Sequence, residues 1–504
     1  MSQRRSETLM SAKTSHGELR PELLLGPNIF LEALPPPIEF LHIPGRLGRR
    51  PLADIDWRAT RPSLRETLLE TVELHFVATS QLIEIFAGVQ TLIRRALLLK
   101  DEAHQGGRRR INQISVATTR SDIRRIDKLD GAGLLCGGMT ATGKSSIFKR
   151  SCEIIAPEQV IDYGNSAVCG WYRLKQCVYL FVDFASNGSR GGLLKRILEE
   201  LDAALGTDYL HDHRRTTNLD TLLVDVCKLL SLHRVALLVI DEKQQSNFAE
   251  SPWRIEFVLF YLTLMNLGIS VAMAGNPLAF EHLRAFSQVM RRFSIGGIHE
   301  LAPAILKSDK WWDRDFVPGA REFNLVETWD VDPVERANFE RENSGRLPGL
   351  YMPLHTEVQR SALRRGGDQA KVTMKDFTAA INSPRFAADR DIALSVWSDE
   401  ASESTRYMDV PEIRRGSAKH DEDGTRSAPS TPSLQSIEVV KKLVRKFTSD
   451  QTRKTNALIA QLEAMKGLDP DDLRTLGVTT DLLAQMEKSI STRRPVAGKP
   501  TGKG

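Results

Sequence analysis

A glycine-rich stretch, CGGMTATGKSSIFKR, carries the residue types and spacing that most directly predict chemistry. From Gly138 it reads GMTATGKS, a complete match to the phosphate-binding pattern G-x-x-x-x-G-K-[ST]. Glycines let such a loop point backbone N–H groups at phosphate oxygens, Lys144 adds a positive charge at the β- and γ-phosphates, and the Ser145 hydroxyl is a ligand for Mg²⁺. The residues expected to contact the nucleotide are Gly138, Met139, Thr140, Ala141, Thr142, Gly143, Lys144, Ser145 and Ser146.

Two acidic residues directly follow an apolar run over 235–240. A continuous run of this kind predicts a strand that is buried on both faces, so Asp241 and Glu242 would emerge at its carboxyl end, where ligands bind in open α/β sheets. We predict that Asp241 holds Mg²⁺ through its water shell and that Glu242 polarises the attacking water.

Four further polar candidates lie downstream. Asn276 ends the apolar segment ISVAMAGNP and would sense the γ-phosphate or the water, or else cap a helix that begins at Pro277. Arg291 and Arg292 occupy a predicted helix end, from which an arginine would reach a neighbouring subunit's nucleotide; the alternatives are compensation of the helix dipole and a surface salt bridge. Arg346, in SGRLPG, would contact phosphate from a lid or simply lie on the surface.

The elements that must position these residues alternate between strands and helices. Strands are expected in GLLC (133–136), QCVYLFVDFASNGS, 235–240 and ISVAMAGNP, and helices over 145–156, 192–205 and 219–232. This alternation implies an α/β fold with a parallel sheet.

The 504 residues, 41% of them hydrophobic, are enough for two or three domains. Residues 63–99 have a helical period. The expected segments are an extended N-terminal arm (1–60), a helical region with a basic segment (61–128), the nucleotide-binding core (129–300), a helical lid region (301–397), a disordered linker (398–435), and a C-terminal helical segment with a basic tail (436–504).

The basic segment His104–Arg125 contains six arginines and a single acidic residue. It is either a solvated loop or a surface that contacts nucleic-acid phosphates, and the net charge of +5 permits the second interpretation without demonstrating it. The residues proposed to contact DNA are Arg108, Arg109, Arg110 and Arg120.

One uncharged stretch, Phe257–Gly275, is long enough to cross a membrane. Asn266 and Gly268 are expected to break it into a core helix and a strand, so we predict no membrane partner.

The five cysteines are odd in number and form no C-x-x-C, and the N-terminus has no apolar signal segment. These features predict a cytoplasmic protein.

Phosphate loop, acidic strand, Asn-ended strand, arginine pair and lid follow one another in the order of AAA+ ATPases. More narrowly, the sequence resembles the TnsC family and its TniB relatives, which are ATP-dependent target regulators of multi-protein DNA transposons. The segments that carry the resemblance are YLFVDFASNGSRGGLLKRILEELDAALGTDYL, ALLVIDEKQQ with ISVAMAGNPLAF, and FAGVQTLIRRALLLKDEAH. The likeness covers roughly residues 80–385 and implies an AAA+ P-loop NTPase, with its parallel sheet sandwiched by helices, a small helical lid and a helical C-terminal extension.

The resemblance also implies an activity. Its members assemble with ATP and Mg²⁺ into rings or helical filaments around duplex DNA without sequence specificity, link a target-selection protein to the transposase, and disassemble upon hydrolysis. The family's nucleotide residues correspond to Lys144, Ser145, Asp241, Glu242 and Asn276, and its trans-acting arginine to Arg291 or Arg292. Two departures concern Lys243 and Gln244, where an apolar residue and then Gln are expected, and Asn276, where relatives often have Thr.

Two other functions share the nucleotide site. One is an AAA+ or STAND-like signalling ATPase whose partners are proteins and whose hydrolysis does not depend on DNA. The other is a non-enzymatic adaptor that binds ATP, barely hydrolyses it, and docks a partner through a helix over 437–465.

Overall fold

The structure is a computed structural model that describes residues 27–184, 189–216, 218–243, 254–276, 280, 283, 287–304 and 310–397. The predictions made for residues 1–26, for the linker over 398–435 and for the C-terminal segment over 436–504 lie outside these residues.

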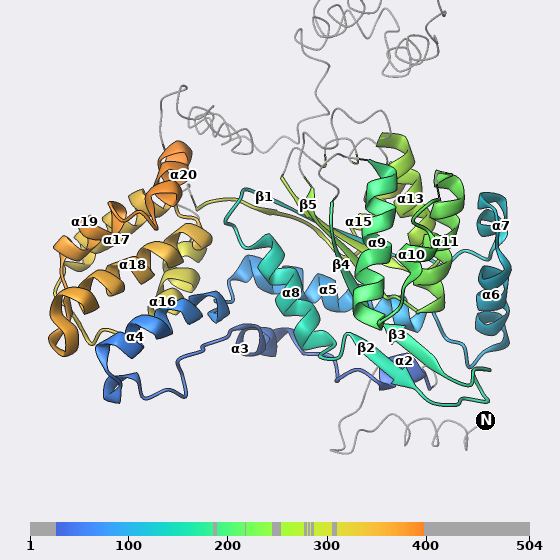
Figure 1. The fold of residues 1–504 in the computed structure, drawn as a ribbon, viewed down its shortest axis with the longest axis horizontal. Coiled ribbons are helices and arrows are strands. Elements are labelled where there is room, and N and C mark those ends of the chain that lie inside the picture. The colour runs from blue at the N-terminus through green and yellow to red at the C-terminus, as the bar shows by residue number, and fades with distance from the viewer. Residues whose placement is uncertain are drawn as a thin grey trace, which may run out of the picture. The chain divides into compact units, whose positions relative to one another are not determined.

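A five-stranded sheet lies at the centre of the α/β core (Figure 1). Its strand order is β4-β5-β6-β1-β7, and every neighbouring pair is parallel, as the sequence predicted. The strands are β1 (Gly133–Gly138), β4 (Tyr179–Asp183), β5 (Leu237–Lys243), β6 (Ser270–Gly275) and β7 (Ile298–Leu301). The edge strand β7 was not predicted, because its short, half-exposed sequence IHEL lacks the apolar run that marks the central strands.

Helices cover both faces of this sheet. Along β5, Leu237 and Val239 pack into one hydrophobic layer while Leu238 and Ile240 pack into the other, so the strand is buried on both sides. One layer contains α5 (Ser80–Leu98) and α8 (Lys144–Ile155). The other contains α9 (Arg190–Leu205), α11 (Leu219–Leu232), α13 (Arg254–Asn266) and α15 (Ser287–Phe293), with the short α10 (Tyr209–Asp212) beside α9. A sandwiched parallel sheet of this kind is the predicted fold class.

The uncharged stretch over 257–275 divides as predicted. Helix α13 ends at Asn266, Gly268 turns the chain with a φ of +78°, and β6 begins at Ser270. Within the described part of the chain, no helix is both long and apolar enough to cross a membrane.

The N-terminal residues 27–60 are not the extended arm that their prolines suggested. They form α2 (Ile29–Glu32), η2 (Phe40–His42), α3 (Ile43–Leu47) and η3 (Trp57–Ala59). The apolar residues between the prolines fix these turns, because Phe30, Leu31, Ile43 and Leu47 are fully buried in the layer that contains α5.

The helical period over 63–99 is divided among three helical elements. The chain forms α4 (Pro62–Leu68), continues as the 3-10 helix η4 (Leu69–Leu74), and starts again at α5. The break is fixed by Phe76, whose backbone pairs with that of Arg49 in an isolated β-bridge. The basic segment is also helical, since it forms α6 (Gln105–Val116) and α7 (Arg120–Arg125). A hairpin of β2 (Val160–Tyr163) and β3 (Leu174–Cys177) was not predicted.

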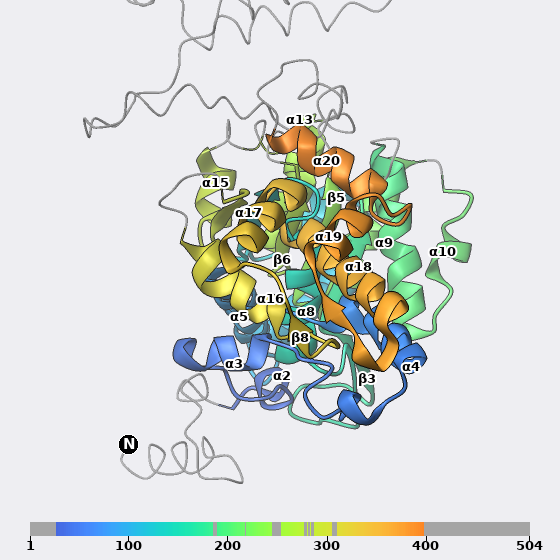
Figure 2. The same ribbon diagram turned by 90° about the vertical axis from the view of Figure 1, so that its left-hand side faces the viewer.

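The predicted helical lid is present (Figure 2). It comprises η6 (Trp312–Phe316), α16 (Val317–Arg321), α17 (Pro333–Ser344), α18 (Pro348–Gly366), η7 (Gly367–Gln369), α19 (Met374–Ile381) and α20 (Ala387–Trp397), with a short parallel pair of β8 (Thr328–Trp329) and β9 (Lys371–Val372). Residues 49–76, here called the strap, join its core: Leu52, Trp57 and Leu69 pack with Phe323 and Val358.

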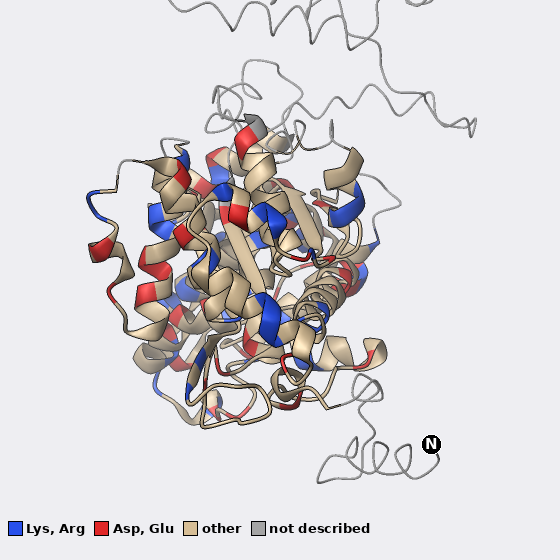
Figure 3. Ribbon diagram, turned by 90° about the vertical axis from the view of Figure 1, so that its right-hand side faces the viewer, with Lys and Arg blue, Asp and Glu red and all other residues tan. Residues whose placement is uncertain are grey.

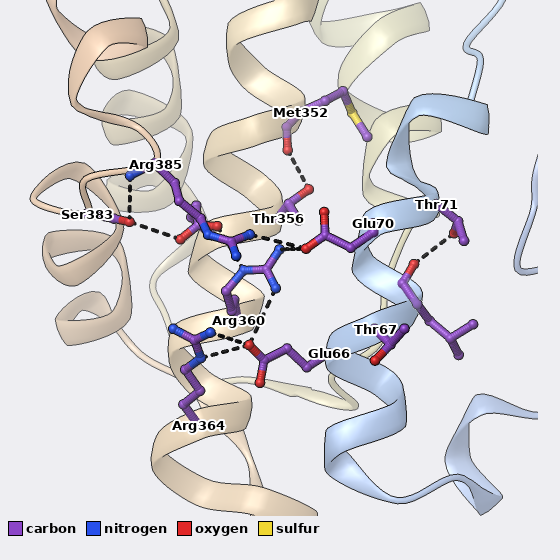
Figure 4. A network of polar contacts seen from close by, with 12 residues as sticks. Glu66, Thr67, Glu70, Thr71, Met352, Thr356, Arg360, Arg364, Ser383 and Arg385 are labelled. Carbon is purple, nitrogen blue, oxygen red and sulfur yellow. Dashed lines mark hydrogen bonds and ion pairs between the residues drawn. The ribbon is translucent and has the colours of Figure 1, made fainter.

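Ion pairs fasten the strap to the lid (Figure 4). The side chain of Arg360 is only 4% exposed, and its guanidinium donates to Glu70 of η4 at 3.1 Å and to Glu357 at 2.8 Å. Arg364 donates to Glu66 of α4 at 2.8 Å. The buried Arg360 guanidinium would lose compensation of its charge without these carboxylates, and the pairs with Glu66 and Glu70 link α4 and η4 to α18.

Acidification is expected to destabilise the lid through His355. Its ring lies between Trp329 and Tyr351, with centroid separations of 5.3 and 5.8 Å, and burial lowers its pKa from 6.5 to about 4. Between these two pKa values the unfolded chain binds a proton that the folded protein does not, so the free energy of unfolding falls as the pH falls, by up to roughly 3 kcal/mol.

Urea unfolding of the wild type and of His355→Asn between pH 7 and pH 4 measures this effect. The variant should be less stable at neutral pH, because it loses the ring contacts, and should show a shallower loss of stability on acidification. Parallel pH curves for the two proteins would contradict the assignment to His355.

Candidate functional site

The phosphate loop joins β1 to α8 in the tight conformation that its glycines predict. Gly143 has a φ of +92° and immediately precedes the helix. A Cβ on Gly138 would lie 2.8 Å from Oγ1 of Thr142 and 2.9 Å from the carbonyl oxygen of Leu301, so only glycine fits there. The Thr142 hydroxyl closes the loop by donating to the Met139 carbonyl at 2.7 Å. The N–H groups of the first turn of α8, which contains Ser145 and Ser146, are left for an anion.

Lys144 lies across this loop. Its Nζ donates to the carbonyl oxygens of Gly138 at 2.8 Å and of Met139 at 2.6 Å. Burial raises the pKa of the Cys136 thiol to about 12, and the charges of Lys144 and Asp241 act on that thiol in opposite directions. The ammonium and the carboxylate therefore both lie near the end of β1.

The acidic strand ends at the same edge of the sheet as the phosphate loop, with one strand between them. Strand β6 lies between β5 and β1, and its last residue, Gly275, pairs with Gly137. Asp241 of β5 is buried, and Asn276 follows β6 at the same edge of the sheet. The side chain of Glu242 lies outside the described residues, although its backbone belongs to β5.

A cavity of about 280 Å³ opens beside the phosphate loop. Its walls come from the loop and the start of α8 (Thr142, Gly143, Ser146), the strap and the residues after it (72–82), and the start of α18 (Pro348, Gly349, Met352). This volume is near the lower end of the range for small-molecule sites, about 300–1,000 Å³, and the lining is mainly apolar. A cavity of this size with a mainly apolar lining is of the kind that binds small molecules.

The sequence analysis did not predict that residues 72–82 form a wall of this cavity. The signal was present in HFVATS, where β-branched residues and two hydroxyl residues interrupt the helical period before α5. In this wall, His75 contacts the Gly319 carbonyl through Nε2 at 3.0 Å, and burial lowers its pKa, which favours a neutral ring at pH 7.

The two candidate trans-acting arginines are not brought to the chain's own phosphate loop. Arg291 and Arg292 lie in the last turn of α15, next to Phe293, which packs against Gly133 at the first residue of β1. The phosphate loop follows the opposite end of that strand. Arg291 is exposed and Arg292 is half-buried.

Arg346 lies on the lid side of the site. It follows Gly345, has a left-handed φ of +54°, and its guanidinium donates to the carbonyl of Ala304, three residues after β7. The next residue, Leu347, packs against Met139 of the phosphate loop. Arg346 is therefore near the loop, and its predicted phosphate contact remains a prediction.

One of the four proposed DNA-contact residues is corrected by the structure. Arg110 is buried, and burial lowers its pKa, so it is not available at the surface. Arg108 donates to the carbonyls of Ala103 and Val168, and Arg120 pairs with Asp220 at 3.0 Å. Arg109 is exposed on α6. On the side of the molecule that carries α6 and α7, basic and acidic residues are interspersed (Figure 3).

The comparisons with known proteins give one family match. A family model described as bacterial TniB protein matches residues 120–300. A comparison with curated protein sequences found no match.

Solved structures of three proteins show distant similarity. Cdc6p of Pyrobaculum aerophilum is 10% identical, with a TM-score of 0.36 over 54% of this chain and 66% of that one, just under two thirds. Orc1 of Aeropyrum pernix in complex with DNA is 16% identical, with a TM-score of 0.35 over 71% and 83%. Domain III of the replication initiation protein DnaA of Thermotoga maritima is 12% identical, with a TM-score of 0.31 over 54% and 95%. All three TM-scores are below 0.5.

The family match spans the basic helix α7, the phosphate loop, the acidic strand and β6, and it ends inside β7. The same residues form the parallel sheet whose carboxyl edge carries Lys144 and Asp241. Over residues 120–300, which hold the phosphate loop and the acidic strand, this chain is therefore similar to the bacterial TniB family.

Proposed function

We propose that this protein is a cytoplasmic, ATP-dependent regulator of DNA transposition. It oligomerises with ATP on duplex DNA as a ring or filament, bridges a target-selection protein to the transposase, and is reset by hydrolysis. The observation that carries the proposal is the convergence of the phosphate loop and Asp241 at one sheet edge, within the segment that matches the TniB family model.

The residues present fit ATP and Mg²⁺. The N-terminus of α8 and Lys144 would bind the phosphates, and the cavity beside them would hold the base. The Ser145 hydroxyl and the Asp241 carboxylate are oxygen donors of the kind that Mg²⁺ prefers, and the metal would neutralise charge on the β- and γ-phosphates. Glu242 and Asn276 would orient the attacking water.

Hydrolysis in this proposal depends on assembly. Arg291 and Arg292 lie beside the first residue of β1, away from their own phosphate loop, so either would meet a nucleotide only in a neighbouring subunit. An arginine supplied in this way stabilises charge in the transition state of phosphoryl transfer. The polymer on DNA would therefore be the active ATPase.

DNA binding is expected to be steeply salt-dependent, because a regulator of varied targets must contact the backbone and not the bases. Arg109 is the exposed member of the predicted set. The Arg109→Ala variant should weaken ATP-dependent binding to mixed-sequence duplex and reduce the slope of log K against log salt by about 0.9 for each phosphate that is no longer neutralised. Fluorescence anisotropy at several salt concentrations measures the slope.

Arg61→Ala provides the control, since Arg61 is also exposed but lies in the strap. An unchanged slope in Arg109→Ala would remove α6 from the proposed DNA surface. Phosphate release with and without duplex DNA tests the function as a whole. Hydrolysis indifferent to DNA would favour the signalling ATPase, and nucleotide binding with almost no hydrolysis would favour the adaptor.

A further inference from the structure

The lid helix α18 begins against the phosphate loop and lacks a cap of its own. Leu347, at the N-cap position, makes no side-chain hydrogen bond to the helix, and Pro348 has no N–H. The first N–H that the helix offers, that of Gly349, donates to the carbonyl oxygen of Ala141 at 2.8 Å. A carbonyl of the phosphate loop therefore satisfies the start of the lid helix.

The contact between Gly349 and Ala141 leaves no room for a side chain at position 349. A Cβ on Gly349 would lie 2.9 Å from Cα, Cβ and the carbonyl oxygen of Ala141, a separation that real Cβ atoms essentially never show. Ala141 itself has a φ of +66°, a left-handed conformation that is unfavourable for a residue with a side chain. Leu347 and Leu350 of the lid pack around it together with Met139. The left-handed residue of the phosphate loop is therefore also the residue that the first turn of the lid helix contacts.

The same helix is anchored further along its length. Arg360 and Arg364 pair with Glu66 and Glu70 of the strap (Figure 4). The strap leads directly into the wall of the cavity beside the loop. Helix α18 therefore contacts the phosphate loop at its first turn and the strap at its fourth and fifth turns.

We propose that Gly349 is a positioning residue of the nucleotide site. Because it has no side chain, α18 can approach Ala141 closely enough to hold the phosphate loop in its nucleotide-binding conformation. The inference rests on the proposed function, since it takes ATP as the ligand of the loop. Gly349 also lines the cavity beside the loop, and the inference adds to this position an action on the loop through Ala141.

The test compares two glycine substitutions in the same helix of the full-length protein. Gly349→Ala forces the helix away from the loop, whereas a Cβ at Gly366 would lie an ordinary 3.6 Å from that of Ala370. Calorimetric titration with ATP and Mg²⁺ should give binding at least about tenfold weaker for Gly349→Ala and within about twofold of wild type for Gly366→Ala. Hydrogen exchange of the peptide over 138–146 should accelerate only in Gly349→Ala.

A second substitution separates positioning from general damage. Ala141→Gly removes one of the three close contacts with a Cβ at position 349, and glycine adopts the left-handed conformation of this position without steric cost. In the Gly349→Ala background it should therefore restore ATP affinity by about threefold or more. If Gly349→Ala does not fold, Leu347→Ala serves instead, because it reduces the apolar contact with Met139 without a steric clash. This variant should also bind ATP more weakly than the wild type.

The outcomes distinguish this inference from the proposed function. If the wild type binds ATP and the folded Gly349→Ala protein binds it equally well, the inference is wrong while the proposed function stands. If the wild type binds no ATP, the proposed function fails. In that case the hydrogen-exchange comparison still decides whether Gly349 holds the loop, and unchanged exchange over 138–146 would refute it.

Discussion

Replacing Lys144 by alanine should abolish ATP binding or weaken it by at least about thirtyfold. The ammonium is the positive side chain of the phosphate loop, where its Nζ lies 2.6–2.8 Å from two loop carbonyls. Truncating one member of a desolvated, hydrogen-bonded charge pair costs about 2–5 kcal/mol, which corresponds to this loss or more. Titration of the purified protein with ATP and Mg²⁺ measures it, and hydrolysis should fall in parallel.

The matched control is Lys149→Ala, because Lys149 is an exposed lysine on the same helix, α8. Its binding should remain close to that of the wild type. Thermal unfolding without nucleotide should be nearly unchanged in Lys149→Ala, whereas Lys144→Ala also loses two hydrogen bonds to loop carbonyls. Tight ATP binding by Lys144→Ala would overturn the assignment of the phosphate loop.

The central sheet could be predicted because the burial of its strands on both faces requires continuous apolar runs, which are visible in the sequence. Strand β5 is buried on both faces, so every position is apolar until Asp241, and the run and its polar end mark both the strand and the site. The phosphate loop is equally local, since its glycines and Lys144 act within eight residues. Helix α11 was predicted at its observed bounds, Leu219–Leu232, for the same reason.

The remaining parts of the site depend on contacts between segments that are far apart in the chain. Such contacts cannot be predicted from a single sequence. The residues HFVATS indicate a break in the helical period over 63–99, but the bridge from Phe76 to Arg49 joins segments far apart in the sequence. Arg110 reads as a surface arginine beside Arg109, yet the turn of α6 buries it near Glu102 and Arg234. The cavity wall and the contact between Gly349 and Ala141 are of the same kind.

The second large effect is expected from Glu242→Gln. Glutamine keeps the size of the side chain but cannot act as a base, so ATP should bind almost normally while hydrolysis falls by about 10²–10⁴-fold. The position follows from the sheet: Glu242 comes directly after the buried Asp241 in β5, at the edge where the phosphate loop leaves β1. Phosphate release under saturating ATP measures the loss.

Because assembly would follow ATP binding and disassembly would follow hydrolysis, the same substitution should leave long-lived complexes on duplex DNA. Dissociation of labelled duplex, followed after addition of unlabelled competitor, should be slower for Glu242→Gln than for the wild type. Glu153→Gln is the control, since Glu153 lies exposed on α8 and pairs only with Arg150 among the ion pairs of the described residues. A Glu242→Gln protein that hydrolyses at the wild-type rate would exclude Glu242 as the base. One that loses hydrolysis yet leaves DNA at the wild-type rate would show that hydrolysis does not drive release.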